Sequence, residues 1–224
     1  MRDLRGQSVF VVGASGGLGA SIARVLDGRG ARLCLAGRSE ERLSALGLDA
    51  PRCVVDVRTP GWADVALDAA RAAYGGVDGV VLATGVVAFG RAHDVPLEVV
   101  DALTAVNFRG PMEMLRAFAA LPPGGFLVSL SGIVAEQAFP GLSAYGAGKA
   151  ALSMATRAVA LELRARGSLV IDARPGHTET GLATRPLHGT APRMPAGLAP
   201  ARVAERIVRA VEEGERDLPP AAFA

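Results

Sequence analysis

The sequence contains little of several features that mark particular classes of protein. Only two cysteines, Cys34 and Cys53, occur among 224 residues, and aromatic residues make up 4%. The cysteines lie in separate apolar runs and no CxxC pair is present, so we expect buried free thiols rather than disulfides. No histidine has metal-ligand spacing, and we expect no metal centre. The low aromatic content provides no stacking cage for a large planar substrate.

Charge of one sign is not concentrated anywhere along the chain. Lysine and arginine together number 24 against 22 acidic residues, giving a formal charge of +2, and no basic block occurs. We therefore expect no nucleic-acid partner. The apolar run before Gly13 is too short for a signal-peptide core, and no later run is long enough to span a bilayer. We expect a cytoplasmic protein without a membrane partner, with one domain over residues 1–224.

What the sequence does contain is a regular alternation of short β-rich runs and longer helical patterns. The β-rich runs are continuously apolar, which is typical of parallel strands covered by helices on both faces. The alternation predicts an α/β fold with a doubly wound parallel sheet. The expected strands are 8–13, 31–37, 51–57, 77–85, 124–132 and 168–176, and the expected helices are 17–30, 39–47, 61–75, 96–121, 143–167 and 199–214. We expect Pro111 to bend or divide the fourth helix.

A glycine-rich turn, GASGGLG (13–19), joins the first expected strand to the first expected helix. Gly13 would permit the tight turn, Gly17 would let backbone approach a pyrophosphate, and Gly19 would let the helix pack close to the strand. The start of the helix offers free N–H groups and the positive end of a dipole. A flexible loop is the alternative, but the strand–turn–helix context favours dinucleotide binding. The expected contact residues are Gly13, Ser15, Gly16, Gly17, Leu18 and Gly19.

The end of the second expected strand favours NADP(H) over NAD(H). A site for NAD(H) carries an acid about twenty residues after the turn, whereas here Arg38 occupies that place and the first acid is Glu40. Arginine can form charge-assisted hydrogen bonds to a 2′-phosphate and stack on adenine. The alternative is a solvated turn arginine. Asp56, which ends the third expected strand, either meets the adenine amino group or caps the next helix.

Four further motifs follow the glycine-rich turn along the chain: ATG (83–85), Asn107 in AVNFRG, YGAGK (145–149) and PGHTET (175–180). We call PGHTET (175–180) the closing segment. Together with the glycine-rich turn, these motifs resemble the short-chain dehydrogenase/reductase family over nearly the whole chain. The resemblance implies a Rossmann-type sheet of strand order 3-2-1-4-5-6-7. It implies a homodimer or homotetramer in which the helices of Asn107 and Tyr145 pack against a partner. It also implies further cofactor contacts from Val57, Ala83, Thr84, Gly85, Tyr145, Lys149, Pro175, Gly176, Thr178 and Thr180.

The residue pair Tyr145 and Lys149 points to acid–base chemistry. The two lie four residues apart on one expected helix and so share a face. A free tyrosine has a pKa of about 10, and a nearby ammonium and an oxidised nicotinamide would both lower it. The resemblance implies that Tyr145 is the general acid/base, that Lys149 also holds the nicotinamide ribose, and that Asn107 carries a water. We expect NADPH-dependent reduction of a small-molecule carbonyl to a secondary alcohol, or the reverse reaction.

One position departs from the family pattern. The family's helper serine lies thirteen residues before the tyrosine, and this position is Gly132. Ser131 is one residue off, so on a strand its side chain should face away unless a bulge re-aims it. A missing oxyanion donor typically costs about 10²–10³ in rate. Ser131, a backbone N–H, a water or a substrate group could replace it. The alternatives are an NADP(H)-binding sensor or scaffold with little turnover, and a non-redox cyclase or dehydratase.

The substrate itself cannot be identified from the sequence. The residues expected to define it lie in a substrate-side loop of about 178–198, which is rich in proline and glycine over 185–197 and is the best candidate for a mobile loop. His177 falls in the closing segment, where it could contact substrate. Glu136 and Gln137 follow the Gly132 position and either line the pocket or belong to a solvated loop.

Overall fold

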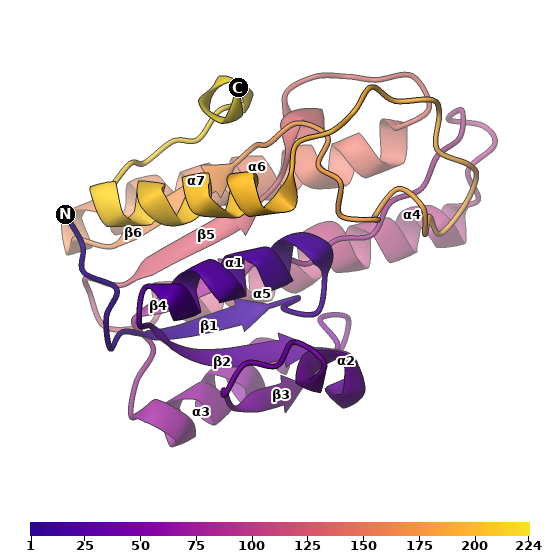
Figure 1. The fold of residues 1–224 in the computed structure, drawn as a ribbon. Helices are drawn as coiled ribbons and strands as arrows, with labels where there is room; N and C mark the ends of the chain where they lie inside the picture. Colours follow the sequence, from indigo (N-terminus) through magenta and orange to yellow (C-terminus); the bar gives the residue numbers. More distant parts are fainter.

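Six parallel strands form one sheet in the order β3-β2-β1-β4-β5-β6 (Figure 1). The computed structural model describes residues 1–224. The strands are β1 (Ser8–Val12), β2 (Arg32–Gly37), β3 (Arg52–Val54), β4 (Gly79–Leu82), β5 (Phe126–Leu130) and β6 (Leu169–Ala173). The predicted doubly wound parallel sheet and the order of these strands are confirmed. In place of a seventh strand, Leu218 makes a single parallel bridge to Ala173, because Pro219 and Pro220 follow it and have no N–H for a ladder.

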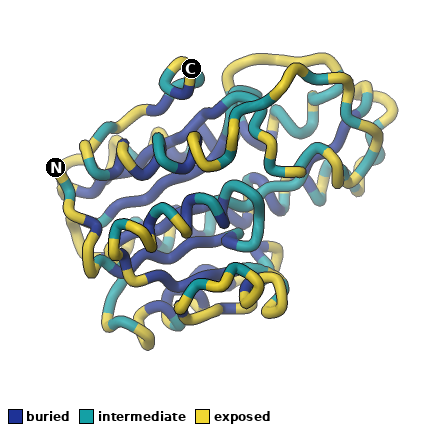
Figure 2. Tube along the Cα trace, viewed as in Figure 1, coloured by how far each residue is buried: buried dark blue, intermediate teal, exposed yellow.

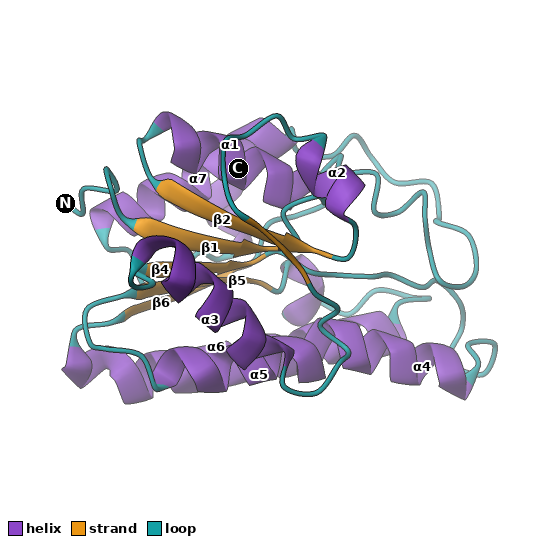
Figure 3. Cartoon of the chain, turned by 90° about the horizontal axis from the view of Figure 1, so that it is seen from below, coloured by secondary structure: helices purple, strands orange, loops and turns teal.

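Helices cover both faces of the sheet (Figure 3). α1 and α7 lie on one face with the short α2, and α3, α5 and α6 lie on the other. Alternate residues of β1 enter opposite cores: Val9 and Val11 pack on the α1 side, and Phe10 and Val12 on the α6 side. This two-sided burial explains why the strands are continuously apolar. The helices are α1 (Gly17–Gly28), α2 (Glu40–Ser44), α3 (Trp62–Tyr74), α4 (Leu97–Thr104), α5 (Gly110–Ala119), α6 (Ser143–Leu163) and α7 (Pro200–Glu213).

The helical stretch predicted over 96–121 is interrupted, as expected from Pro111, but by a π-helical turn rather than a simple bend. This turn spans Ala105–Arg109 and separates α4 from α5. Pro111 has no N–H, so the carbonyl of Asn107 lacks the donor that an α-helix would supply four residues later. Pro111 itself lies in the first turn of α5, where a missing N–H costs least.

The carboxyl ends of the parallel strands meet at one edge of the sheet, which is where ligands bind in doubly wound folds. The long connection from β6 to α7 lies beside this edge and contains no buried residue between Gly176 and Arg202 (Figure 2). It is nevertheless tied down. Thr178 pairs with Leu198 at its base, and the Leu187 N–H donates to the Val87 carbonyl at 2.8 Å in its middle. No helix combines the length and hydropathy needed to cross a bilayer.

Candidate active site

The glycine-rich turn after β1 leaves no room for side chains at several of its positions, so its backbone is accessible to a ligand. Gly13 adopts φ +78°, and a Cβ there would lie 2.7 Å from the Ala83 carbonyl oxygen after β4. A Cβ on Gly19 would overlap the Gly13 carbonyl, so α1 packs directly on the turn. α1 begins at Gly17 after a Gly16 N-cap that contributes no side-chain hydrogen bond. Its first N–H groups are therefore available to phosphate oxygens, and the turn fits a dinucleotide.

The closing segment lies against this turn. A Cβ on Gly17 would lie 2.7 Å from the Thr180 carbonyl oxygen. The Thr178 hydroxyl donates to the Gly176 carbonyl at 3.0 Å, while the Thr180 hydroxyl oxygen accepts from the Leu182 N–H at 3.4 Å. His177 is paired with Glu179 through Nε2 and Oε1 at 3.3 Å. The fold thus brings together the two predicted ends of the cofactor site, which are more than 150 residues apart in sequence.

Arginines surround the end of the site next to β2 and β3. Arg38 is exposed and makes no ion pair, and its charge acts on Asp56. Arg58 donates to both Asp56 carboxylate oxygens, through Nε at 3.0 Å and Nη2 at 2.6 Å. Hydrogen bonding from Arg58, with a smaller effect of Arg38, lowers the pKa of Asp56. Asp56 is thus already bonded within the chain. Val57 beside it is buried.

Sequence reasoning missed Arg42 and Arg58 at this end of the site. Arg42 lies one helical turn beyond Arg38, and its Nη2 donates to the Ser15 carbonyl of the glycine-rich turn at 3.2 Å. The end of β2 is also close to Ser15, since a Cβ on Gly37 would lie 3.2 Å from the Ser15 hydroxyl. The available signal was the spacing of two arginines in RSEER (38–42), which places both near the start of one short helix.

Lys149 is the point where several predicted motifs converge. Its side chain is buried, and its ammonium donates to the Leu130 carbonyl at 2.8 Å and to the Thr84 carbonyl at 3.4 Å. A Cβ on Gly85 would lie 3.5 Å from Lys149 Nζ and 3.6 Å from Asn107 Oδ1. The ATG segment after β4, the π-helical turn and α6 therefore meet at this amine.

The oxygen and the nitrogen of the Asn107 side-chain amide are both hydrogen-bonded to the backbone of Val86. Its Oδ1 accepts from the Val86 N–H at 3.0 Å, and its Nδ2 donates to the Val86 carbonyl at 2.9 Å. The amide group is also completely buried. The backbone carbonyl of Asn107 lacks the usual α-helical donor, because Pro111 has no N–H.

Tyr145 lies one turn before Lys149 on α6 and is half-buried. Burial raises the pKa of Tyr145 to about 12. The expected lowering by the ammonium is therefore wrong for the chain by itself. The reason is that Lys149 directs its ammonium to backbone carbonyls, while burial also lowers the pKa of Lys149 to about 8. At neutral pH Tyr145 is a neutral phenol.

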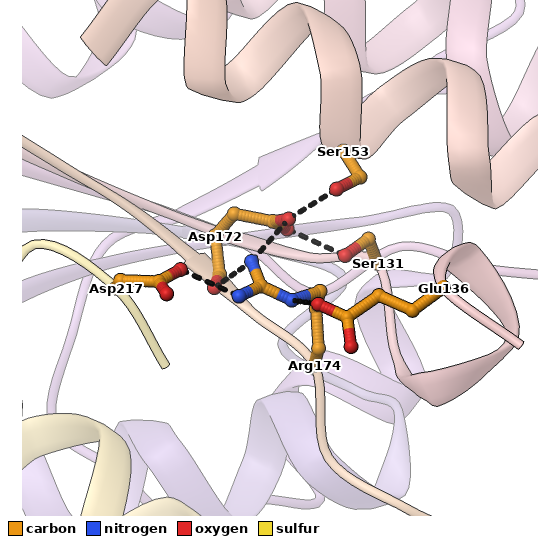
Figure 4. Close-up of polar contacts among 6 residues, drawn as sticks. All are labelled: Ser131, Glu136, Ser153, Asp172, Arg174 and Asp217. Carbon is orange, nitrogen blue, oxygen red and sulfur yellow. Dashed lines mark hydrogen bonds and ion pairs between the residues drawn. The ribbon is translucent and has the colours of Figure 1, made fainter. Parts of the chain in front are cut away.

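The neighbours of the missing helper serine have no free donor. The N–H groups of Ser131 and Gly132 donate to the Ala173 carbonyl at 3.1 and 3.3 Å, and that of Ile133 donates to the Pro175 carbonyl at 2.9 Å. The Ser131 hydroxyl is buried and donates to Asp172 Oδ1 at 2.5 Å (Figure 4). The structure thus turns Ser131 toward Asp172. Ser131 and the N–H groups of residues 131–133 are therefore already bonded within the chain.

Of the two polar residues in the loop after Gly132, Gln137 fits the solvated-loop reading and Glu136 departs from both expectations. Glu136 forms an ion pair with the buried guanidinium of Arg174, and Gln137 is exposed. Arg174 and Asp172 were missed by sequence reasoning, although two charged residues inside the apolar run LVIDARPG (169–176) are a visible signal. Buried charges require partners, so such a pair indicates an internal ion-pair cluster.

Comparison with known proteins gives a consistent result. A sequence model described as short chain dehydrogenase matches residues 7–188. A glycine betaine reductase of Emericella nidulans is 31% identical over 192 residues, which cover 80% of this chain but only 15% of that protein. An uncharacterized oxidoreductase of Staphylococcus epidermidis is 30% identical over 187 residues, covering 80% of this chain and 81% of that protein.

Solved structures are similar over the whole chain. A short chain dehydrogenase from Burkholderia cenocepacia in complex with NADP is 29% identical, with a TM-score of 0.85 and complete coverage of both chains. A 3-ketoacyl-(acyl-carrier-protein) reductase from Brucella melitensis, complexed with NADH, is 24% identical with a TM-score of 0.86, covering 96% of this chain and 97% of that one. At 24% identity the second structure supports the fold alone.

Proposed function

Because the chain belongs to the short-chain dehydrogenase family of oxidoreductases, we propose that it reduces a small-molecule carbonyl to a secondary alcohol with NADPH, or catalyses the reverse reaction. One observation carries this proposal. Tyr145 and Lys149 lie one turn apart on α6, and Lys149 meets the Thr84 and Gly85 backbone at the same sheet edge as the glycine-rich turn. A proton donor and a dinucleotide cradle therefore share one site.

Tyr145, Lys149 and Asn107 have different roles in the proposed reaction. A bound nicotinamide cofactor supplies the hydride. Tyr145 is the general acid: burial keeps it protonated at neutral pH, so it can donate its proton to the oxygen of a carbonyl substrate. This protonation state suits reduction better than alcohol oxidation, which requires a phenolate. Lys149 orients the nicotinamide ribose, and the backbone carbonyl of Asn107 would hold the water through which the proton of Tyr145 is replaced.

The substrate oxygen has one donor fewer than in the family pattern. Gly132 has no hydroxyl, and the N–H groups of residues 131–133 are all used within the chain. Tyr145 is then the main donor to the oxygen. Losing one oxyanion donor typically costs about 10²–10³ in rate. We therefore expect slow turnover with unactivated ketones and faster turnover with substrates whose own groups stabilise the developing charge.

A preference for NADPH over NADH is supported by the arginines at the adenosine end. Arg38 is exposed with no carboxylate partner, and Arg42 reaches the carbonyl of Ser15 in the glycine-rich turn. Two guanidinium groups near one ribose suit a 2′-phosphate, which provides several charged acceptors. A cofactor without the phosphate would leave these charges without a partner.

The proposal extends to the assembly and its setting. We propose a single catalytic domain, 1–224, that forms a homodimer or homotetramer in the cytoplasm, where the free thiols of Cys34 and Cys53 stay reduced. Met154 and Leu161 on the outer face of α6 are 65% and 73% exposed, and large apolar side chains on one helix face favour association. A monomeric mass by light scattering would refute the assembly.

The test of function compares the two tyrosines of the chain. NADPH oxidation is followed over a panel of aldehydes and ketones for wild type, Tyr145→Phe and Tyr74→Phe. Tyr74 donates to the Leu33 carbonyl at 3.0 Å, far from the site in sequence, and serves as the matched control. We expect Tyr145→Phe to lower kcat/KM at least about 10²-fold and Tyr74→Phe to leave it within a factor of about two.

Two other outcomes would replace the proposal. Tight NADPH binding without carbonyl-dependent oxidation by the wild type would indicate a sensor or scaffold. Conversion of a substrate without any change in cofactor absorbance, still lost in Tyr145→Phe, would indicate a cyclase or dehydratase.

A further inference from the structure

A buried ion-pair cluster lies behind Lys149, on the side of the sheet covered by α6. We call it the Asp172 cluster, and it consists of Ser131, Glu136, Ser153, Asp172, Arg174 and Asp217 (Figure 4). The side chains of Asp172 and Arg174 are only 2% and 3% exposed. Burying charges costs several kcal/mol per ion unless the geometry compensates, so the contacts of this pair need an explanation.

The carboxylate of Asp172 is held in one orientation. The Ser131 hydroxyl donates to its Oδ1 at 2.5 Å, the Ser153 hydroxyl donates to its Oδ2 at 2.5 Å, and Arg174 Nη1 donates to Oδ2 at 2.9 Å. Three donors from three different residues therefore fix the position of the Asp172 carboxylate beside the Arg174 guanidinium.

Arg174 does not simply neutralise the charge of Asp172, because its guanidinium also pairs with two other carboxylates. It also pairs with Glu136 after β5, and its Nη2 donates to Asp217 Oδ1 at 2.5 Å. One guanidinium thus serves three carboxylates, and the cluster as a whole is negative. Glu136 and Asp217 have side-chain exposures of 43% and 64%, so water screens these two partners while Asp172 is shielded from it.

The two hydroxyls that hold Asp172 come from the two elements that hold Lys149. Ser153 lies one helical turn after Lys149 on α6. Ser131 directly follows Leu130, whose carbonyl accepts from the Lys149 ammonium at 2.8 Å. The position of Asp172 therefore depends on the same two segments that hold Lys149, namely the end of β5 and α6.

The other groups facing Lys149 provide no compensating charge. Tyr145 on its own helix is neutral, Asn107 on the π-helical turn is an amide, and Thr84 after β4 contributes a carbonyl. Burial lowers the pKa of Lys149, and Asp172 is the one charged group that opposes this change. Desolvation without an opposing carboxylate would favour the neutral amine.

We propose that Asp172 is a positioning residue that keeps the buried amine of Lys149 in its ammonium form. The consequence for catalysis rests on the proposed function, in which Lys149 orients the ribose and takes part in proton supply to Tyr145. The charge on Lys149 is a property of the chain alone, so it can be measured without substrate or cofactor.

The sequence offers an unusually direct measurement, because Lys149 is the only lysine in the chain. Protein made with lysine labelled with ¹³C at Cε gives a single side-chain lysine signal, whose shift follows the protonation of Nζ without any assignment. The titration is run on wild type, Asp172→Asn and Asp217→Asn. Asp217→Asn is the matched control, since it also removes a carboxylate from Arg174.

We expect the wild-type midpoint near pH 8 and an Asp172→Asn midpoint about 1 to 3 pH units lower. Asp217→Asn should titrate like wild type. In Asp172→Asn, the single amide oxygen still accepts from Ser131, and Arg174 keeps the carboxylates of Glu136 and Asp217. Arg174→Gln provides a second, opposite test: it leaves Asp172 uncompensated and should raise the midpoint. Equal midpoints for wild type and Asp172→Asn, or a fall in Arg174→Gln, would overturn the proposal.

The pH dependence of kcat then distinguishes a failure of this inference from a failure of the proposed function. In the NADPH-dependent assay, the alkaline limb of kcat should move to lower pH in Asp172→Asn by the interval seen in the titration, and should not move in Asp217→Asn. A shifted lysine titration with an unchanged rate profile would leave the role of Asp172 intact and contradict the assigned role of Lys149 in catalysis.

Discussion

Replacing Gly132 by serine introduces the residue type that the family pattern has at this position, and the backbone predicts that the change costs stability. Gly132 has φ +83° and ψ 169°, a region occupied essentially only by glycine, where another residue costs about 1–3 kcal/mol. Space is not the limit, because an added Cβ would meet only the Pro175 carbonyl oxygen, at 3.6 Å. For a domain of this size the expected loss corresponds to a Tm about 2–12 °C lower.

Chemical denaturation of wild type and Gly132→Ser measures this loss, with an unchanged m-value expected because the exposed surface is the same. Gly28→Ser is the control: Gly28 lies in α1, a Cβ there meets nothing within 4 Å, and its φ is not positive. It should change the free energy of unfolding by no more than about 0.5 kcal/mol.

We also expect no gain in turnover from Gly132→Ser, because the new hydroxyl begins beside the Pro175 carbonyl, a ready acceptor. Wild-type stability combined with a rate increase of about 10² would refute the reasoning. It would mean that the loop rearranges easily and that a donor at this position is all the site lacks.

Three further predictions concern the cofactor and the buried amine. Arg42→Ala should raise the Kd for NADPH about 3- to 10-fold and leave that for NADH unchanged by fluorescence titration, whereas the exposed Arg24→Ala should change neither. Gly17→Ala should weaken binding of both cofactors, because its Cβ would lie 2.7 Å from the Thr180 carbonyl oxygen; equal affinities would show that the closing segment moves freely. Burial lowers the pKa of Lys149 to about 8, below about 10.4 in an unfolded chain. At this site the unfolded chain then binds more protons, so Lys149 should contribute up to about 3 kcal/mol to the stability of the cofactor-free protein from pH 8 to 10. The raised pKa values of Cys34, Cys53 and Tyr145 act in the opposite direction, so the contribution is measured as the change with pH in the stability difference between wild type and Lys149→Met.

Local patterns in the sequence were sufficient to predict the fold class. Continuous apolar strands indicated two covered faces, and Phe10 and Val11 do pack on opposite sides of the sheet. The order of six strands followed from the family resemblance. The missing seventh strand is explained by Pro219 and Pro220 after Leu218, a signal that was visible but was not weighed against the resemblance.

The parts of the site that could not be predicted depend on contacts between distant segments. Ser131 meets Asp172 across 41 residues, and the N–H of Gly132 is used by the carbonyl of Ala173. Neither strand alone indicates these pairings. The pKa of Tyr145 was expected to fall from the charge of a neighbour on the same helix, but it is governed by burial, which is a property of the packed chain.

The ties along the β6–α7 connection affect how the substrate range of this enzyme could be changed. The Thr178–Leu198 bridge closes the connection at its base, and the hydrogen bonds of Leu187 and His188 to Val87 and Phe89 fix its middle. The connection therefore consists of two short loops, each with anchored ends, and closing a short loop costs little entropy. Residues 181–186 and 190–196 can thus be randomised as two separate libraries, which leave Thr180 and the hydrogen bond from the Gly197 N–H to Glu179 Oε1 in place.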